Sequence, residues 1–278
     1  MSGPGGRLRA MSLSDLTFAR WRTLDTAAAA RFAEEAARRV DGSILSVDAT
    51  AHLGGTLHRA VIERDGERYA LVPGGEVTVG FDVEAWEPSP EQLVSYREES
   101  VAGGFGFDED PRAHLARVMT PLRTAVLPTV LMAVEPRKLP ELPALVPALL
   151  AEQGLRVPGP DEWEHACGAG ARTLFRWGGD VPQGASPYGA GDGPHHRRNA
   201  FGLQIASDVY DTAEMTSDPG SVYGGDGGEA VCGGYGTLLE WLPLATANRN
   251  PATAEFLHGP EGEDMFEDFG VRPVIALD

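Results

Sequence analysis

Hydrophobic residues at helical spacing are clearest near the start of the chain. An Ala-rich helix is predicted over residues 27–40, with Thr26 as its N-cap. Phe32, Ala36 and Val40 recur at helical spacing, so we expect them to form the buried stripe of this helix.

Short runs of β-branched and apolar residues follow, separated by turn signals. Asp65-Gly66 is typical of a hairpin turn, and Pro128 confines the start of its run to a sheet edge or a bulge. Pro160 is placed like the first residue of a helix. The acidic, Gly-rich stretch 87–112 indicates loop with a short helix. The predicted strands are 44–47, 59–64, 68–72, 76–81 and 126–134, and the further predicted helices are 146–153 and 160–167.

Regular periodicity fades after about residue 168, where Gly, Pro, Asn and Asp are dense. Such a composition alone would indicate disorder, but the segment holds too many aromatic residues for a solvated tail. We therefore predict a loop-rich domain held by aromatic anchors, which are Trp177, Tyr188, Phe201, Tyr210, Tyr223, Tyr235, Trp241 and Phe269.

The charge balance narrows the class of partner. The 278 residues include 41 Asp and Glu against 23 Lys and Arg, giving a formal net charge of −18. An acidic surface disfavours nucleic acid and anionic membranes as partners. We expect no membrane span and no secretory signal, and therefore a cytoplasmic protein with two reduced cysteines, Cys167 and Cys232.

Several motifs occur in a fixed order over about 210 residues. They are Leu71-Val-Pro-Gly-Gly75, Arg156-Val-Pro-Gly-Pro-Asp-Glu-Trp-Glu164, Phe175-Arg-Trp-Gly178, Asn199-Ala-Phe-Gly-Leu203, Glu214-Met-Thr-Ser-Asp218, Cys232-Gly-Gly-Tyr235, Arg249 and Phe269-Gly-Val-Arg-Pro-Val274. In this order they resemble the motifs of the formylglycine-generating enzyme family, the sulfatase-modifying factors. The resemblance implies an α+β fold, namely the loop-rich C-type-lectin-like fold of that family.

The resemblance also suggests a division of the chain. We predict a disordered N-terminus over residues 1–13, an N-terminal helix and β-strand element over 14–67, and a formylglycine-generating-enzyme-like domain over 68–278. Most motif residues have structural interpretations. Trp163 is expected in the core, Arg156 in an ion pair with Glu162 or Glu164, and Asn199 on backbone groups of a turn.

The catalytic residues of the family do not carry over. Its oxidising members hold copper with two cysteines shortly after the Arg-Gly-Gly-Ser element, and residues 235–244 contain none. Cys232 stands where the family has arginine. A second branch binds iron through histidines of an N-terminal bundle, but His52, His58 and His114 lack its His-x-x-x-His spacing. Neither metal chemistry is therefore expected here.

Two other metal sites are conceivable. His195-His196 is the one adjacent histidine pair, although neighbouring side chains on regular structure point apart. Asp208, Asp211 and Asp218 could bind calcium, which takes oxygen ligands from loops and which the family carries near this segment.

A binding groove is predicted around Tyr235, Glu240, Trp241, Asn248 and Arg249, because this region lines the substrate groove of the family and Trp with Arg is typical of a binding hot spot. Alternatively, Trp241 caps the core and Arg249 ties two loops together. If the groove is acidic, it favours a cationic or metal-bridged ligand over an anionic one.

Three functions follow from these patterns. The first is a pseudoenzyme, a scaffold that binds a peptide, a protein or a small molecule. The second is a metal-dependent oxidase or oxygenase that uses a non-cysteine site in the same groove. The third is a partner-binding component that docks through residues 14–72.

Overall fold

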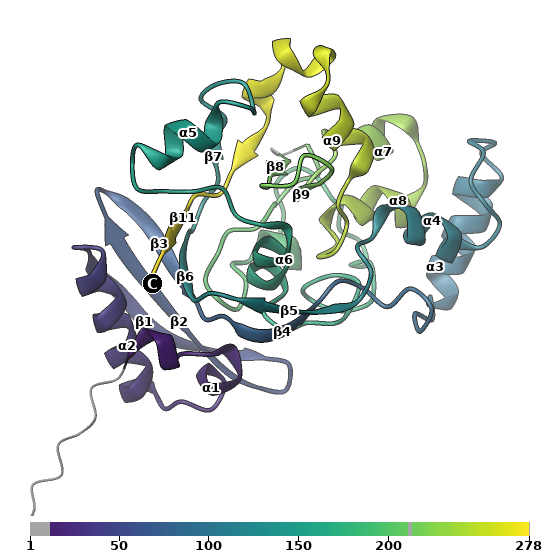
Figure 1. Cartoon of the computed structure of the whole chain (residues 1–278). Coiled ribbons are helices and arrows are strands. Elements are labelled where there is room, and N and C mark those ends of the chain that lie inside the picture. The colour runs from purple at the N-terminus through teal and green to yellow at the C-terminus, as the bar shows by residue number, and fades with distance from the viewer. Residues whose placement is uncertain (1–11, 211–212, 278) are drawn as a thin grey trace, which may run out of the picture.

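The chain is an α+β protein with mainly antiparallel sheets. A computed structural model describes residues 12–210 and 213–277. Of the predicted disordered segment, residues 1–11 lie outside the described residues, whereas Leu13 already begins a 3-10 helix, Leu13–Asp15. In Figure 1, α2 (Thr26–Arg39) and the largest sheet lie at one end of the molecule, α3 (Pro90–Ser95) and α4 (Pro111–Val118) at the other, and α6 (Pro160–Gly168) between them.

The largest sheet has five antiparallel strands in the order β1-β2-β3-β6-β11. The Asp65-Gly66 hairpin is confirmed: both residues have positive φ, 54° and 81°, and the strands on either side pair. Pro128 separates two strands rather than lying within one, because β5 ends at Leu127 and β6 begins at Val130. The strands of this sheet are β1 (Ser43–His52), β2 (Gly55–Arg64), β3 (Glu67–Val72), β6 (Val130–Ala133) and β11 (Val274–Ala276).

Helix α2 (Thr26–Arg39) covers β1 and β2. Its N-cap is Asp25 and not Thr26, because the Asp25 carboxylate accepts a hydrogen bond of 2.7 Å from the amide of Ala28. Phe32 and Ala36 are fully buried, as predicted. The short helix α1 (Phe18–Trp21) precedes α2.

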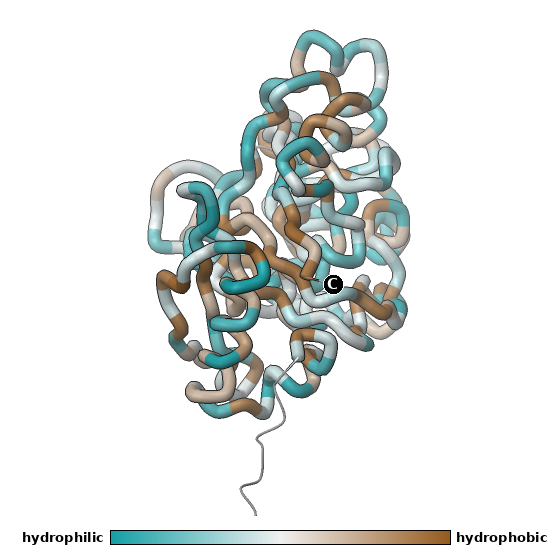
Figure 2. The backbone as a smooth tube through the Cα atoms, turned by 60° about the vertical axis from the view of Figure 1, so that its left-hand side comes forward, coloured by the Kyte–Doolittle hydropathy of each residue, from teal (hydrophilic) through white to brown (hydrophobic). Residues whose placement is uncertain are grey.

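The predicted boundary at residue 67 falls at the first residue of β3. Strands on both sides of it, β2 and β3, pair in one sheet, and residues 14–67 share one hydrophobic core with the C-terminal strand β11. Figure 2 shows hydrophobic segments around the C-terminus and mainly hydrophilic outer loops.

Two smaller sheets organise the rest of the chain. One pairs β4 with β5 beside α6, and the other has the order β7-β10-β8-β9. Strand β10 brings the C-terminal segment next to the Glu214 motif. Their strands are β4 (Gly75–Val79), β5 (Arg123–Leu127), β7 (Arg137–Lys138), β8 (Glu214–Met215), β9 (Val222–Tyr223) and β10 (Gly270–Val271).

The predicted helices at 146–153 and 160–167 are present, the second opened by Pro160 as expected. Residues 87–112 hold more helix than predicted: α3 passes into a π-helical turn, Tyr96–Val101, and α4 begins at Pro111. The remaining helices are α3 (Pro90–Ser95), α4 (Pro111–Val118), α5 (Val146–Ala151), α6 (Pro160–Gly168), α7 (Glu229–Gly233), α8 (Thr237–Trp241) and α9 (Pro251–His258).

Three motif residues make the contacts that their structural interpretations predict. Trp163 is 2% exposed and stacks on Tyr223 at 4.6 Å. Arg156 donates to both carboxylate oxygens of Glu162, at 2.7 and 2.5 Å. The Asn199 side chain makes four hydrogen bonds to backbone groups, so it locks a turn. Within the described residues, no helix has the length and hydropathy needed to cross a membrane.

Candidate functional site

A groove of two adjoining pockets runs along α7 and the first turn of α9. The inner pocket has a volume of about 280 Å³ and the outer one about 560 Å³. Asp226, Glu229, Ala252 and Thr253 line both pockets and so form their common wall. We call this feature the α7 groove.

Aromatic side chains form the far wall of the inner pocket. The ring centroid of Tyr235 lies 5.1 Å from that of Phe105 and 5.4 Å from that of Phe107, both in edge-to-face geometry. The imidazole of His114 packs edge-to-face on Phe107 at 5.2 Å. All four rings line this pocket, and a wall of aromatic rings is suited to an apolar or cationic group.

Helix α3 and the turn that follows it hold the Tyr235 segment in place. Ser100 Oγ donates to the carbonyl oxygen of Tyr235 at 2.5 Å, and Glu99 accepts from the amide of Thr237 at 2.6 Å. Burial alone would raise the pKa of Glu99, but hydrogen bonds from Thr237 and Ser95 outweigh it and lower that pKa. Glu99 is therefore a fixed, charged acceptor at the start of α8.

Two glycines are needed where the Tyr235 and Phe105 rings pack directly against the backbone. A Cβ at Gly233 would lie 2.5 Å from the Tyr235 ring, and a Cβ at Gly103 would lie 2.4 Å from the Phe105 ring. Any larger residue at these two positions would push the rings out of the pocket wall.

Two carboxylates face the aromatic wall. Asp226 accepts hydrogen bonds from the amides of Gly228 at 2.8 Å and Ala230 at 3.0 Å, and burial raises its pKa. Glu229 is exposed, and its side chain makes no ion pair or hydrogen bond with any described residue. Glu229 is thus an available negative charge in the wall of an aromatic pocket.

His114 adds no competing positive charge. Burial, and next the charge of Arg117, lower its pKa to about 4, so the imidazole is neutral at neutral pH. The inner pocket therefore combines neutral aromatic rings with acidic groups.

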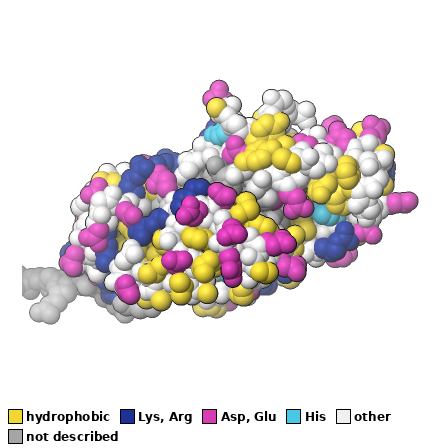
Figure 3. All heavy atoms as spheres, turned by 90° about the horizontal axis from the view of Figure 1, so that it is seen from above, with side chains coloured by type: hydrophobic (Ala, Val, Ile, Leu, Met, Phe, Trp, Pro, Cys, Tyr) yellow, Lys and Arg dark blue, Asp and Glu magenta, His cyan; other side chains and the backbone are white. Residues whose placement is uncertain are grey.

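The outer pocket also combines apolar side chains with acidic groups. Phe256, Phe269 and Met265 provide apolar surface, Asp268 another carboxylate, and Lys138 a single cation. Figure 3 views the molecule from the side of α7 and α9, and it shows acidic side chains spread over this face between hydrophobic patches. The groove can accommodate an extended ligand with apolar and cationic parts.

The five residues of the predicted groove lie in different environments. Tyr235 lines the inner pocket. Trp241 is 1% exposed and packs edge-to-face on His195, and Asn248 is buried with its amide on the carbonyl of Leu242. Arg249 donates to the carbonyl of Arg117 at 3.1 Å, and burial raises the pKa of Glu240. Tyr235 is thus the member that lines the α7 groove, whereas Trp241 and Asn248 are buried in the interior.

The histidine pair is not part of a larger cluster of potential metal ligands among the described residues. The rings of His195 and His196 are 3.9 Å apart, and burial lowers the pKa of His195 to about 4. Among the described residues, no three His, Cys, Asp or Glu side chains converge on a point that could hold a metal ion.

The candidate calcium ligands are occupied by local hydrogen bonds. Asp208 accepts from the amides of Gly189 and Tyr210, and Asp218 accepts from the amide of Gly220. Asp211 lies outside the described residues. Calcium binding by this set stays a prediction.

The two cysteines form no disulfide, and one is buried while the other is exposed. Cys167 is buried, and burial raises its pKa to about 11. Cys232 is exposed, with its sulfur 3.3 Å from the hydroxyl of Tyr210.

Sequence reasoning missed Phe105, Phe107, Asp226 and Glu229. The signal was present in Gly103-Gly-Phe-Gly-Phe107, where aromatic residues alternate with glycines, but its packing partner lies about 130 residues away in the chain.

A scan against protein-family models finds no match for this chain, and neither does a search of curated proteins.

Proposed function

We propose that this protein is a ligand-binding scaffold, without the copper-dependent cysteine oxidation of the family it resembles, and that the α7 groove binds a ligand with a cationic group. The single observation that carries the proposal is the aromatic inner pocket of Phe105, Phe107 and Tyr235 with the unpaired carboxylate of Glu229 at its wall. The sequence resemblance supports a divergent member of the formylglycine-generating enzyme family with a C-type-lectin-like fold.

The groove selects for positive charge in two ways. Aromatic faces attract a cation by about 0.5–2 kcal/mol, more when water is excluded. A carboxylate within a few ångströms adds a Coulomb attraction that a neutral ligand of the same shape does not receive. Alkylated ammonium groups gain most, since they lose less hydration than a primary ammonium when they enter an apolar site.

The outer pocket indicates that the ligand is longer than its cationic group. Phe256, Phe269 and Met265 would contact an apolar segment next to that group. A peptide, a protein loop or a small molecule that carries a cation and an apolar arm matches this arrangement.

The test is a calorimetric titration with choline and with 3,3-dimethylbutan-1-ol, its neutral isostere. Both compounds fill the same volume, so the difference in Kd isolates the effect of charge. We expect choline to bind at least tenfold more tightly than the alcohol. Equal affinity, or no binding of either compound, would refute the proposal.

A further inference from the structure

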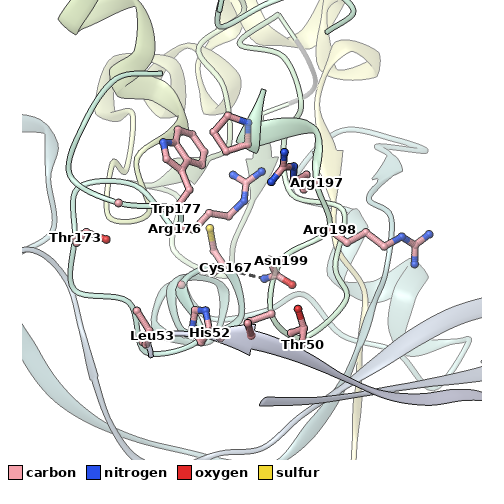
Figure 4. A pocket seen from close by; sticks show the side chains of 15 residues that line it. Thr50, His52, Leu53, Cys167, Thr173, Arg176, Trp177, Arg197, Arg198 and Asn199 are labelled. Carbon is pink, nitrogen blue, oxygen red and sulfur yellow. Dashed lines mark hydrogen bonds between the residues drawn. The ribbon is translucent and has the colours of Figure 1, made fainter. Parts of the chain in front are cut away.

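A second pocket, of about 440 Å³, lies where the end of β1 meets the end of α6 and the segments 173–178 and 194–200 (Figure 4). Its lining includes His52 and three arginines, Arg176, Arg197 and Arg198, and no Asp or Glu. This composition is unexpected in a protein with a formal net charge of −18.

Arg176 is the deepest of these cations. It is 9% exposed, and its Nη2 donates to the carbonyl oxygen of His195 at 2.6 Å. Its Nη1 is buried and has no hydrogen-bond partner among the described residues. A buried guanidinium group with an unpaired N–H donor destabilises the folded state unless an anion accepts a hydrogen bond from that donor and offsets the charge.

No described carboxylate neutralises Arg176. The ion pairs of the described residues do not include it, and burial lowers its pKa. The nearest group that could become an anion is Cys167, but burial raises the pKa of that thiol to about 11, so it stays neutral. The positive charge at the floor of the pocket is therefore uncompensated.

Arg197 supplies a second free cation at the same place. Figure 4 shows the Arg176 side chain between Cys167 and Trp177, with its guanidinium toward that of Arg197, while Arg198 extends away from both. Arg197 is exposed and makes no ion pair with a described residue, whereas Arg198 is paired with Glu135 at 3.1 Å. Two like charges directed at one space destabilise the protein unless something negative occupies that space.

Two other polar side chains of the pocket are already hydrogen-bonded. Asn199 is held by its four backbone contacts, and His52 Nε2 lies 2.9 Å from the carbonyl oxygen of Ala169. Among the donors that remain, the guanidinium groups match the planar geometry of carboxylate and phosphate oxygens.

We propose that Arg176 and Arg197 form a binding site for a small molecule that carries a carboxylate or phosphate group. The oxyanion accepts hydrogen bonds from Arg176 Nη1 and from Arg197, and the remainder of the molecule lies against Leu53, Ala51 and Ala200. This site is separate from the α7 groove, with which it shares no lining residue.

The alternative is that Arg176 acts only in folding, through its bond to His195 and through its position over the Trp177 ring, 5.0 Å from the centroid. The two interpretations differ in what a neutral substitution does. A structural arginine destabilises the fold when it is replaced, whereas an uncompensated ligand-binding charge can be replaced by Met with little or no loss of stability.

The test is calorimetric titration of the full chain with inorganic phosphate and with succinate, at constant ionic strength set with sodium chloride. We expect one of the two anions to bind, and its Kd to rise at least tenfold in Arg197→Gln. Arg38→Gln, an exposed arginine on α2, is the matched control and should leave the Kd unchanged.

Arg176→Met provides the second variant. It should abolish the binding of that anion while its Tm stays equal to or above that of the unchanged protein. Absence of binding for both anions, or an equal Kd in Arg197→Gln and the unchanged protein, would overturn the proposal. If Arg176→Met does not fold, the Arg197→Gln comparison alone decides.

Discussion

Arg272 and Glu214 form an ion pair that is closed off from solvent, with 0% and 1% of their side chains exposed. Arg272 Nε donates to Glu214 Oε2 at 2.8 Å, and the same oxygen accepts from Trp163 Nε1 at 2.8 Å. Arg272 Nη1 also donates to the carbonyls of Ala133 and Val134, at 2.9 and 2.7 Å. The pair therefore ties β6, β8 and α6 to the C-terminal segment.

Glu214→Gln should lower the free energy of unfolding by about 3–5 kcal/mol, because it leaves the buried Arg272 charge without its counter-ion. Urea unfolding followed by circular dichroism measures this loss. Glu35→Gln, which breaks the exposed pair with Arg38, is the control and should cost less than about 1 kcal/mol. Similar losses for both variants would contradict a special role for the buried pair.

The stability of the folded protein should fall in mild acid, because His165 is buried in its neutral form. Burial lowers its pKa to about 4, against about 6.5 in the unfolded chain. Below pH 6.5 the unfolded state therefore binds a proton that the folded state does not, so stability is complete above pH 6.5 and is lost progressively toward pH 4.

Between pH 7 and pH 5 this one group accounts for about 2 kcal/mol of lost stability. His165→Gln should reduce the pH dependence of the unfolding free energy by that amount, whatever its effect at pH 7. His114 and His195, whose pKa values burial also lowers to about 4, should keep the remaining acid sensitivity. An unchanged pH dependence in the variant would show that His165 is not the group responsible.

Periodicity and turn chemistry predicted several elements before residue 168 well. Residues 27–40, the Asp65-Gly66 hairpin and Pro160 are local signals, and each corresponds to an observed element. Helix α4 was missed because its eight residues, Pro111–Val118, form a short helix with a weak apolar stripe. The N-cap of α2 was misplaced by one residue, since Asp25 and Thr26 are both good caps.

The candidate sites were less predictable because they join distant segments. Tyr235 was predicted at the groove, but its ring partners Phe105 and Phe107 are about 130 residues earlier in the chain. The sequence indicates only part of the arginine pocket: His195-His196-Arg197-Arg198 is a basic segment, but Arg176 lies about 20 residues earlier. Arg176 lies within a motif whose neighbours are core residues, and only its packing shows that no described carboxylate accompanies it.

The two cysteines should react very differently with thiol reagents. Cys167 is buried with a raised pKa of about 11, so little thiolate is present and access is blocked, whereas Cys232 is exposed. Ellman titration of the native protein should detect one thiol, and of the urea-unfolded protein two. Cys232→Ser should remove the native signal. A persistent native signal in that variant would place Cys167 at the surface.

Phe105→Ala should weaken ligand binding in the α7 groove while changing the stability of the fold only slightly. The Phe105 side chain is 45% exposed, so its loss should cost less than about 1.5 kcal/mol of stability. It should nevertheless weaken choline binding, because one ring of the aromatic wall is removed. Thermal unfolding and calorimetry on the same sample provide both numbers, and an unchanged Kd would exclude Phe105 from the site.

The most direct test of the central claim is the Kd of choline for Glu229→Gln, measured by calorimetry beside the unchanged protein. The variant keeps the shape of the groove and removes its available charge, so we predict a Kd about tenfold higher, equivalent to about 1.4 kcal/mol. Glu152→Gln, an exposed carboxylate at the end of α5, should leave the Kd unchanged. An equal Kd in Glu229→Gln and the unchanged protein would contradict a cation-binding α7 groove.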